Sequence, residues 1–264
     1  MLLQAIKASI EAGKAILEVY KTNFDVDFKE DKSPLTLADR RADDIIREML
    51  KSTNLPVISE EVEVPDYEIR KNWLQYWLVD PLDGTKEFVN RNGEFTVNIA
   101  LIENNKSVVG VIYAPTIDLL YFCNRREAYK LENAEDHANK CSFVSELIQN
   151  STKLPLPKSE KPFTIVASRS HQNHETKAFI EDIQTQYSEI NIVSKGSSLK
   201  LCMIAEGIAD CYPRFGPTSE WDTAAGHAIV NVSGGKLLLA ENPTQELSYN
   251  KPNLLNPSFI AYSK

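Results

Sequence analysis

The sequence predicts a layered α+β and α/β protein, in which two helices and an antiparallel sheet precede a half where strands and helices alternate. Apolar residues recur at helical spacing within the first 50 residues. From residue 57 to residue 122 they recur at strand spacing, and the connections near residues 104 and 116 are so short that they favour antiparallel neighbours. Beyond residue 162, short apolar runs alternate with helical patterns, as they do in α/β units.

The length and composition favour a folded protein with a large core. The chain has 264 residues, of which 42% are hydrophobic and 25% are charged, whereas a disordered chain combines low hydrophobicity with high net charge. The 37 acidic and 29 basic side chains give a formal net charge of −8, which argues against a broad nucleic-acid surface. An anionic ligand would therefore need a local site that overrides the charge of the whole molecule.

The cysteines and the hydropathy pattern bear on the compartment in which the protein works. The four cysteines form no Cys-x-x-Cys pair and are too few for a disulfide scaffold, so we expect free thiols in a reducing compartment. No apolar run approaches the ~18 residues of a membrane span. Charged residues interrupt the first helix where a signal peptide would be apolar. The expected location is therefore the cytoplasm.

The elements of the first half follow from the spacing of apolar side chains. An apolar residue at every third or fourth position predicts an amphipathic helix over residues 3–20. A polar stretch at 29–34 ends this pattern, and Pro34 and Thr36 precede a second predicted helix over 42–50. Five strands are predicted after it, the last three as an antiparallel meander: 57–59, 77–80, 95–102, 108–114 and 119–122.

A change of composition separates the two halves. Residues 133–162 are polar and end in a proline-rich run, which predicts a surface excursion and a boundary between domains 1–160 and 161–264. The second domain alternates between the two element types. Its predicted strands are 164–167 and 192–193, and its predicted helices are 175–186, 199–205 and 224–232.

The strongest chemical pattern is an apolar strand that runs directly into two aspartates. Gly84 lets the backbone come close to a ligand, so Asp80, the carbonyl of Leu82 and Asp83 can converge as oxygen ligands. With no cysteine or histidine nearby, this set favours Mg²⁺ over Zn²⁺. The alternative is that Asp83-Gly84 is an ordinary turn.

Two other segments present a carboxylate at the end of an element. Ser59-Glu60-Glu61 closes a short strand, and Asp222 stands at the start of a helix. Glu60 and Glu61 could be surface acids, and Asp222 could be an N-cap that accepts hydrogen bonds from free backbone N–H groups. Taken together with the strand-end aspartates, the three segments indicate a site for divalent cations.

In this order, the three motifs resemble those of the lithium-sensitive, Mg²⁺-dependent phosphomonoesterases of the inositol monophosphatase superfamily. They stand at 59–61, 80–85 and 221–226, and so occupy both halves of the chain. The resemblance implies an αβαβα five-layer sandwich that holds two or three Mg²⁺ ions per site. It also implies the metal ligands, which are Glu60, Asp80, the Leu82 carbonyl, Asp83 and Asp222.

Further stretches are similar to one branch of this superfamily, the CysQ-type 3′(2′),5′-bisphosphate nucleotidases. The branch removes the 3′-phosphate of adenosine 3′,5′-bisphosphate, a by-product of sulfate transfer, and 3′-phosphoadenylyl sulfate is a second expected substrate. The similar stretches are 86–88, 91–100, 168–171, 196–200 and 212–217. The residues that they would place around the nucleoside, in the second domain, are His171, Ser197, Lys200 and Arg214.

The basic residues of this group also have a simpler interpretation, since a lone His, Lys or Arg is often a solvated surface charge. The spacing of Ser197 and Lys200 predicts that both side chains lie on one helical face, where they can contact one ligand. The same Ser-x-x-Lys spacing occurs in acyl-transfer enzymes, but no partner motif of such an enzyme is present.

Hydrolysis also needs a group that accepts a proton from the attacking water. The resemblance points to Asp39, hydrogen-bonded to the Thr85 hydroxyl, and in related phosphatases the role is also given to the residue matching Glu60. Thr36-x-x-Asp39 has the spacing of a capping box as well, and Thr85 could cap the next segment. The backbone N–H groups of Gly84 and Thr85 suit a phosphate. The metal-facing residues expected to contact substrate too are Glu60, Leu82, Asp83 and Asp222.

Two other functions remain compatible with the sequence. An inositol or sugar phosphatase would use the same metal motifs, and a non-catalytic nucleotide sensor would keep the fold without the reaction. We expect a small-molecule substrate rather than a nucleic acid, and a monomer or a homodimer. CysQ-type relatives are described as peripheral at the cytoplasmic face of the inner membrane, so such an association is compatible with the resemblance, although no amphipathic anchor stands out.

Overall fold

The computed structural model describes residues 1–22, 26–28, 34–158, 160–167 and 173–264, and only the backbone of 26–28 and 34–36. Its strands form two large sheets and one small one, the last made of β1 (Val26–Phe28) and β2 (Pro34–Thr36). Short helical segments connect other elements. They are η1 (Lys51–Thr53), α3 (Tyr67–Arg70), α4 (Thr85–Val89) and η2 (Pro115–Ile117).

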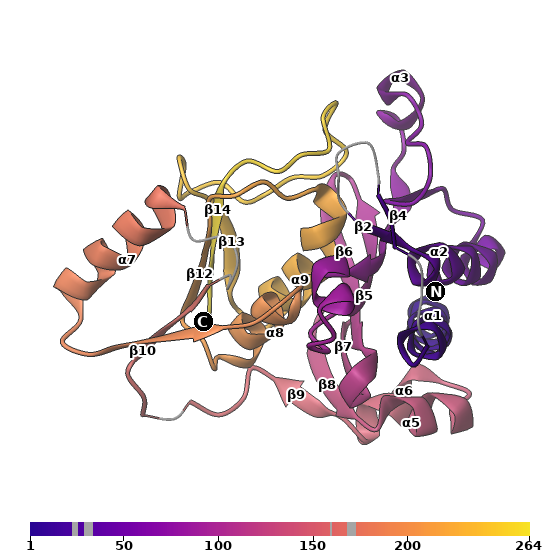
Figure 1. The fold of residues 1–264 in the computed structure, drawn as a ribbon, viewed down its shortest axis with the longest axis horizontal. Helices are drawn as coiled ribbons and strands as arrows, with labels where there is room; N and C mark the ends of the chain where they lie inside the picture. The colour runs from indigo at the N-terminus through magenta and orange to yellow at the C-terminus, as the bar shows by residue number, and fades with distance from the viewer. Residues whose placement is uncertain (23–25, 29–33, 159, 168–172) are drawn as a thin grey trace.

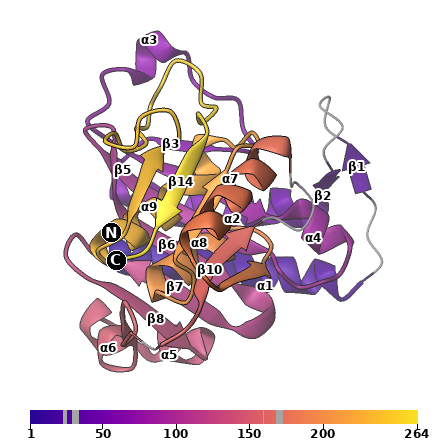
Figure 2. The same cartoon turned by 90° about the vertical axis from the view of Figure 1, so that its left-hand side faces the viewer.

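Helices and sheets alternate in five layers, as the αβαβα expectation requires (Figure 1). On one side, α1 (Leu2–Tyr20) and α2 (Leu37–Leu50) cover the first sheet. Between the two sheets lie α8 (Leu199–Glu206) and α9 (Glu220–Val232). The outermost layer is α7 (His174–Gln186), from whose side Figure 2 views the molecule.

The first sheet has seven strands in chain order, from β3 to β9. β3 and β4 are parallel, and every later neighbour is antiparallel, so the predicted meander is confirmed and continues for two more strands. The strands are β3 (Val57–Ser59), β4 (Gln75–Asp83), β5 (Thr96–Glu103), β6 (Lys106–Ala114), β7 (Leu119–Cys123), β8 (Ala128–Glu132) and β9 (Thr152–Leu154).

The second sheet mixes parallel and antiparallel pairs. Its central strand β12 is parallel to β10 and antiparallel to β14. The order is β11 (Ile190–Ser194), β10 (Phe163–Ala167), β12 (Cys211–Arg214), β14 (Phe259–Tyr262) and β13 (Lys236–Leu239). The sequence predicted only the first two of these strands.

The segment 133–162 differs from the predicted surface excursion. It forms α5 (Ala134–Lys140) and α6 (Val144–Gln149), and it contributes β9 to the first sheet. Several of its apolar residues are buried because they pack on one of the two large hydrophobic cores, while the polar side of each short element faces solvent. The buried ones are Ala134, Ala138, Cys141, Leu147 and Leu154.

Helix α9 lies unusually close to the first sheet, which fixes the position of the site at its first turn. A Cβ added to Gly110 of β6 would lie 2.2 Å from the backbone oxygen of Ala225, so only glycine permits this approach. A Cβ on Gly226 would lie 2.4 Å from Leu201 of α8. The second hydrophobic core surrounds both helices and includes side chains from both sheets.

None of the helices in the described residues combines the length and the apolar composition needed to span a lipid bilayer. The four cysteines are free thiols, as expected, and all four are buried.

Candidate active site

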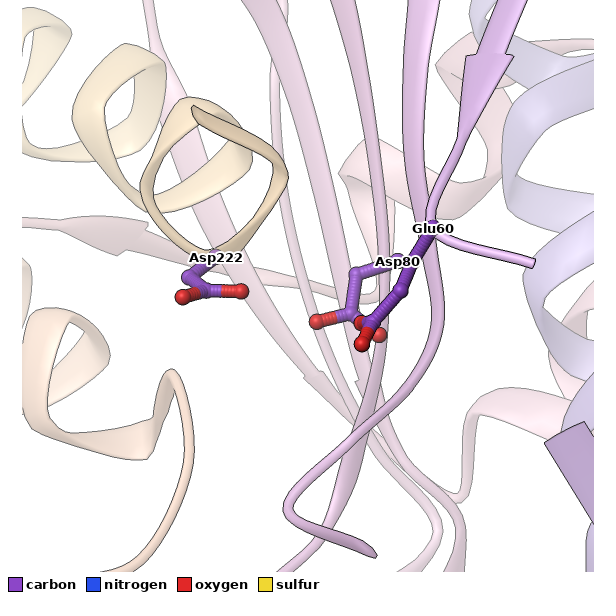
Figure 3. Close-up of side chains that lie close together, drawn as sticks. All are labelled: Glu60, Asp80 and Asp222. Atoms are coloured by element: carbon purple, nitrogen blue, oxygen red, sulfur yellow. The ribbon is translucent and has the colours of Figure 1, made fainter. Parts of the chain in front are cut away.

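Three carboxylates from distant parts of the chain meet at one end of the first sheet. The ligand atoms of Glu60, Asp80 and Asp222 all lie within 4.8 Å of one another. In Figure 3, the carboxylates of Glu60 and Asp80 lie side by side, and that of Asp222 points toward them from the helix opposite. The structure therefore brings together one acid from each of the three predicted motifs.

The pairing of β3 with β4 places the first two acids. Ser59 is in register with Val79, and the backbone N–H of Glu60 donates to the carbonyl of Val79 at 3.3 Å, so Glu60 follows directly beside Asp80. Asp80 is buried, and its Oδ1 accepts the N–H of Leu82 at 3.1 Å. A register shift between Asp80 and Asp83 ends the regular pairing with β5.

The third acid lies in the first turn of α9. Ser219 is the N-cap, and Asp222 is the third helical residue of a capping box, in which its Oδ2 accepts the N–H of Ser219 at 2.8 Å. The interpretation of Asp222 itself as the N-cap was therefore wrong by three residues. Its carboxylate caps the helix and also reaches the acidic cluster.

Without a cation, the cluster is electrostatically unfavourable. Burial, and then the charges of Glu60, Asp83 and Asp222, raise the pKa of Asp80 well above its usual range. Burial, and then Asp83 and Glu60, raise the pKa of Asp222 to about 8. A divalent cation would relieve this repulsion, and a donor set made of carboxylate oxygens suits a hard ion such as Mg²⁺. The residues present fit such an ion.

Asp83 faces a different set of neighbours. Its Oδ2 accepts hydrogen bonds from the Ser197 hydroxyl at 2.6 Å, the Ser198 hydroxyl at 2.7 Å and the Asn98 amide at 3.3 Å. It is not in the group of three described above, although its charge raises the pKa of both Asp80 and Asp222. Its role as a metal ligand stays a prediction.

Three polar residues around Asp83 and Ser197 were not predicted from the sequence as parts of the site. Ser198 donates to Asp83, while Thr96 and Asn98 on β5 bond to Ser197 and Ser198 at 2.6 and 2.7 Å. Thr96 and Asn98 are buried polar residues in an otherwise apolar strand, and that pattern was the available signal.

The residues predicted to handle water and phosphate lie at the same end of the sheet. Asp39 is buried in the first turn of α2, and its charge is one of the causes that raise the pKa of Asp80. The Thr85 hydroxyl donates to the Leu82 carbonyl at 3.4 Å. Gly84 has φ of +94° at the start of α4, a conformation that L side chains rarely adopt.

A cavity of about 150 Å³ adjoins the acids and extends toward the second sheet. It brings together residues predicted for metal, phosphate and nucleoside: Asp83, Gly84, Ser197, Lys200, Arg214 and Asp222. Tyr212 and Phe259 add aromatic surface to its wall. His171, and with it Arg169, lies outside the described residues.

Lys200 is buried against the wall of this cavity. Its Nζ donates to the carbonyl of Ser197 at 2.6 Å and of Lys195 at 3.3 Å, and lies 5.6 Å from the centre of the Tyr212 ring. Burial lowers its pKa to about 8. The prediction that Ser197 and Lys200 share a helical face was wrong, because Ser197, with φ of +52°, precedes the first residue of α8, Leu199.

Arg214 provides a second cation at the cavity. Its Nη2 donates to the carbonyl of Pro217 at 3.0 Å. Its Nε is buried and has no hydrogen-bond partner within the part of the chain that the structure describes. An unsatisfied donor of a guanidinium is costly to bury, so this group is well suited to an anionic ligand.

Nearly the whole chain matches one known protein family. Residues 1–262 match the model of the inositol monophosphatase family. The chain belongs to this family. Its membership agrees with the resemblance of the three acidic motifs and with the five-layer fold.

Among the relatives of this inositol monophosphatase family member are curated proteins named 3′(2′),5′-bisphosphate nucleotidase CysQ. The protein of that name from Salmonella typhimurium is 43% identical over an alignment of 264 positions that covers 98% of each chain. The one from Escherichia coli K12 is 42% identical over the same share of each chain.

Solved structures of other proteins share the fold of this chain. The crystal structure of CysQ from Bacteroides thetaiotaomicron has a TM-score of 0.92 and 46% sequence identity, and the match covers 100% of this chain and 97% of that chain. The extragenic suppressor protein suhB from Bartonella henselae, at 24% identity, shares the fold with a TM-score of 0.74 over 99% and 92% of the two chains.

Proposed function

We propose that this chain is a Mg²⁺-dependent phosphomonoesterase that removes the 3′-phosphate of adenosine 3′,5′-bisphosphate and releases AMP and phosphate. The observation that carries the proposal is the group of three acids beside a cavity with two cationic side chains. The choice of substrate is supported by the identity of 42–43%, over nearly the full length, to proteins named bisphosphate nucleotidases. The 3′-phosphate of 3′-phosphoadenylyl sulfate is a second candidate substrate.

The acids of the cluster would hold two or three Mg²⁺ ions. We assign Glu60, Asp80 and Asp222 as ligands, joined by Asp83 and the Leu82 carbonyl. Bound Mg²⁺ would lower the pKa of the attacking water and neutralise charge on the phosphate and the leaving 3′ oxygen. The four carboxylates match the charge of two divalent cations, so the site becomes neutral before an anionic substrate arrives.

Side chains next to the cluster would handle the proton and the phosphate. Asp39, assisted by the Thr85 hydroxyl, or Glu60 would accept a proton from the attacking water. The backbone N–H groups of Gly84 and Thr85 would donate to phosphate oxygens. Both groups lie at the end of β4, next to the acids, so a phosphate held there is in reach of the water.

The nucleoside and the 5′-phosphate would occupy the cavity toward the second sheet. The Nε of Arg214, which has no hydrogen-bond partner among the described residues, would donate to an anion, and Lys200 adds a positive charge next to the Tyr212 ring. Ser197, which also lines the cavity, would contact the ligand, and His171 would join them. These two cations, together with bound Mg²⁺, would offset the acidic side chains that also line the cavity, so that a bisphosphate can bind to a chain of net negative charge.

A substrate panel tests this function. Phosphate release is measured from adenosine 3′,5′-bisphosphate, inositol 1-phosphate and fructose 1,6-bisphosphate, with Mg²⁺ and with a chelator. We expect the adenosine bisphosphate to have the highest kcat/KM and every rate to disappear with the chelator. Faster turnover of inositol 1-phosphate would instead identify an inositol phosphatase. Tight nucleotide binding without phosphate release at saturating Mg²⁺ would identify a sensor.

A further inference from the structure

The segment 248–256, near the C-terminus, is hydrogen-bonded to the first turn of α9, which carries Asp222. Glu220, two residues before Asp222, is completely buried, at 0% exposure. Its carboxylate accepts the N–H of Asn250 at 2.7 Å and the N–H of Lys251 at 3.0 Å. The Nζ of Lys251 donates to the same carboxylate at 2.6 Å and neutralises its charge. All of the donors that Glu220 meets here thus come from one segment.

Asn256 forms a second set of hydrogen bonds to the same turn of α9. Its amide donates to the carbonyl of Ser219 at 2.7 Å and to the hydroxyl of Thr223 at 3.0 Å. Its backbone N–H donates to the carbonyl of Thr218 at 2.7 Å. In the opposite direction, the N–H of Glu220 donates to the carbonyl of Leu254 at 2.8 Å. The turn is therefore held on both sides of Asp222.

The segment 248–256 is also hydrogen-bonded to Arg70, which lies just before β4 in the chain, and β4 carries Asp80. Arg70 is buried, and its guanidinium donates to Asn250 Oδ1 at 2.8 Å and to the carbonyl of Pro252 at 2.9 Å. The Asn250 amide returns a bond of 2.7 Å to the carbonyl of Arg70. Arg70 ends α3, which precedes β4 in the chain, and Figure 2 shows the segment beside α3.

The hydrogen bonds that hold the first turn of α9 matter because the three carboxylates of the cluster repel one another. The ligand atoms of Glu60, Asp80 and Asp222 lie within 4.8 Å of one another, so the three carboxylates repel one another when no cation lies between them. If the first turn of α9 were not held in place, it could move Asp222 away from the first sheet and so reduce this repulsion. A fully buried carboxylate at position 220 is costly unless each oxygen is bonded, and here the bonds that satisfy it also hold the turn.

We propose that Glu220 and Asn256 are positioning residues for Asp222, which keep this ligand beside Asp80 and Glu60 for the divalent ion. The proposal rests on the proposed function, because it assumes that the cluster holds a cation. It differs from a purely stabilising role, since it predicts a loss of ion affinity that is separate from any loss of fold stability.

Binding of Mn²⁺, used as a spectroscopic substitute for Mg²⁺, tests the proposal. The full-length chain and its variants Glu220→Gln and Asn256→Ala are titrated with Mn²⁺, and free Mn²⁺ is followed by electron paramagnetic resonance. We expect each variant to bind about 10- to 100-fold more weakly, the usual effect of removing a group that orients a metal ligand. The Mg²⁺ concentration for half-maximal rate should rise by the same factor, with the KM for substrate at saturating Mg²⁺ unchanged.

Glu206→Gln is the matched control. Glu206 is also buried on a helix, and it bonds to Tyr121 and Lys130 rather than to the first turn of α9. We expect it to lower the melting temperature without changing Mn²⁺ affinity. Wild-type affinity in a folded Glu220→Gln protein would overturn the inference, and Asn256→Ala decides if that variant does not fold. No Mn²⁺ binding by the wild type would instead overturn the proposed function.

Discussion

At the scale of single residues, the site brings three carboxylates within 4.8 Å of one another. Glu60, Asp80 and Asp222 are far apart in sequence, and their motifs indicated the site because each stands at the end of an element. The hydrogen bonds to Asp83 were not predictable in the same way. Asn98 meets Asp83 because β5 pairs with β4, and Ser198 meets it because the loop before α8 packs on β5. A buried polar residue in a strand can be recognised in the sequence, but its partner cannot.

The pKa values of the acids predict how pH changes the effect of Mg²⁺. Asp80 and Asp222 have folded-state pKa values above their usual 3.8, so the folded state holds protons that the unfolded state releases. The metal-free protein therefore loses stability as the pH rises from about 4 through about 8. Mg²⁺ replaces those protons, so its stabilising effect should be larger at pH 8 than at pH 6.

Thermal unfolding at the two pH values, with and without saturating Mg²⁺, measures this difference. For a chain of this size, each 1 kcal/mol of stabilisation corresponds to a rise of about 2–4 °C in the melting temperature. An equal rise at both pH values would contradict the assignment of Asp80 and Asp222 as ligands.

The position of Arg214 at the cavity predicts that its replacement weakens substrate binding. Losing its charged donors should raise the KM for adenosine 3′,5′-bisphosphate by about 10- to 100-fold, since a hydrogen bond to a charged group contributes about 1.5–3 kcal/mol. The variants are Arg214→Met and Arg214→Lys, and the second keeps the charge but not the planar fork. Steady-state kinetics at saturating Mg²⁺ provide the measurement. The exposed Arg126→Met serves as the control, and an unchanged KM in both Arg214 variants would contradict the role.

At the scale of elements, long segments with one clear period were predicted well. The first helix, the meander from β5 to β7 and α7 all have enough apolar positions to define a face. The short strands β12, β13 and β14 were missed. Each has four residues and pairs with a strand that is not its neighbour in the chain or that follows a long loop, so tertiary packing rather than local pattern determines them.

The close packing of α9 on β6 predicts that Gly110→Ala disturbs the site from a distance. The new Cβ would meet the backbone of Ala225, which cannot rotate away, so the helix must shift. We expect a loss of about 1–3 kcal/mol of stability from overpacking, together with weaker Mn²⁺ binding because the helix carries Asp222. Chemical denaturation and the Mn²⁺ titration give the two values.

Gly207→Asn is the control for that variant. Gly207 has φ of +78° and nothing within 4 Å of an added Cβ, and asparagine tolerates this conformation. Wild-type stability and Mn²⁺ affinity in Gly110→Ala would show that the contact between α9 and β6 does not position the helix.

At the scale of the whole molecule, the chain leaves the first sheet after β9 and enters the second at β10, and the division into two domains near residue 160 stays a prediction. The two sheets are nevertheless joined by a shared core, because α9 from the second half covers the inner face of the first sheet, while α8 packs between α9 and the second sheet. The seven-stranded sheet cannot bury that face alone. The site has the same dependence, since Glu60 and Asp80 come from one half and Asp222 from the other.

This sharing predicts that the two halves unfold together. Urea unfolding of the full chain should give one transition, with far-ultraviolet circular dichroism and tryptophan fluorescence coinciding. A fragment of residues 1–160 should expose the apolar face normally covered by α9 and fail to unfold cooperatively. Two separate transitions, or a 1–160 fragment with the melting temperature of the full chain, would establish two independent folding units instead.

The central claim is that the three acids hold the divalent ions used to remove a 3′-phosphate. Phosphate release from adenosine 3′,5′-bisphosphate, followed while Mg²⁺ is titrated into the wild type and into Asp80→Asn, tests it most directly. We predict saturable dependence on Mg²⁺ in the wild type and a loss of more than about 100-fold in the variant, since removing a ligand should exceed the effect of removing a group that orients one. Turnover without Mg²⁺, or an Asp80→Asn rate within about tenfold of the wild type, would contradict the claim.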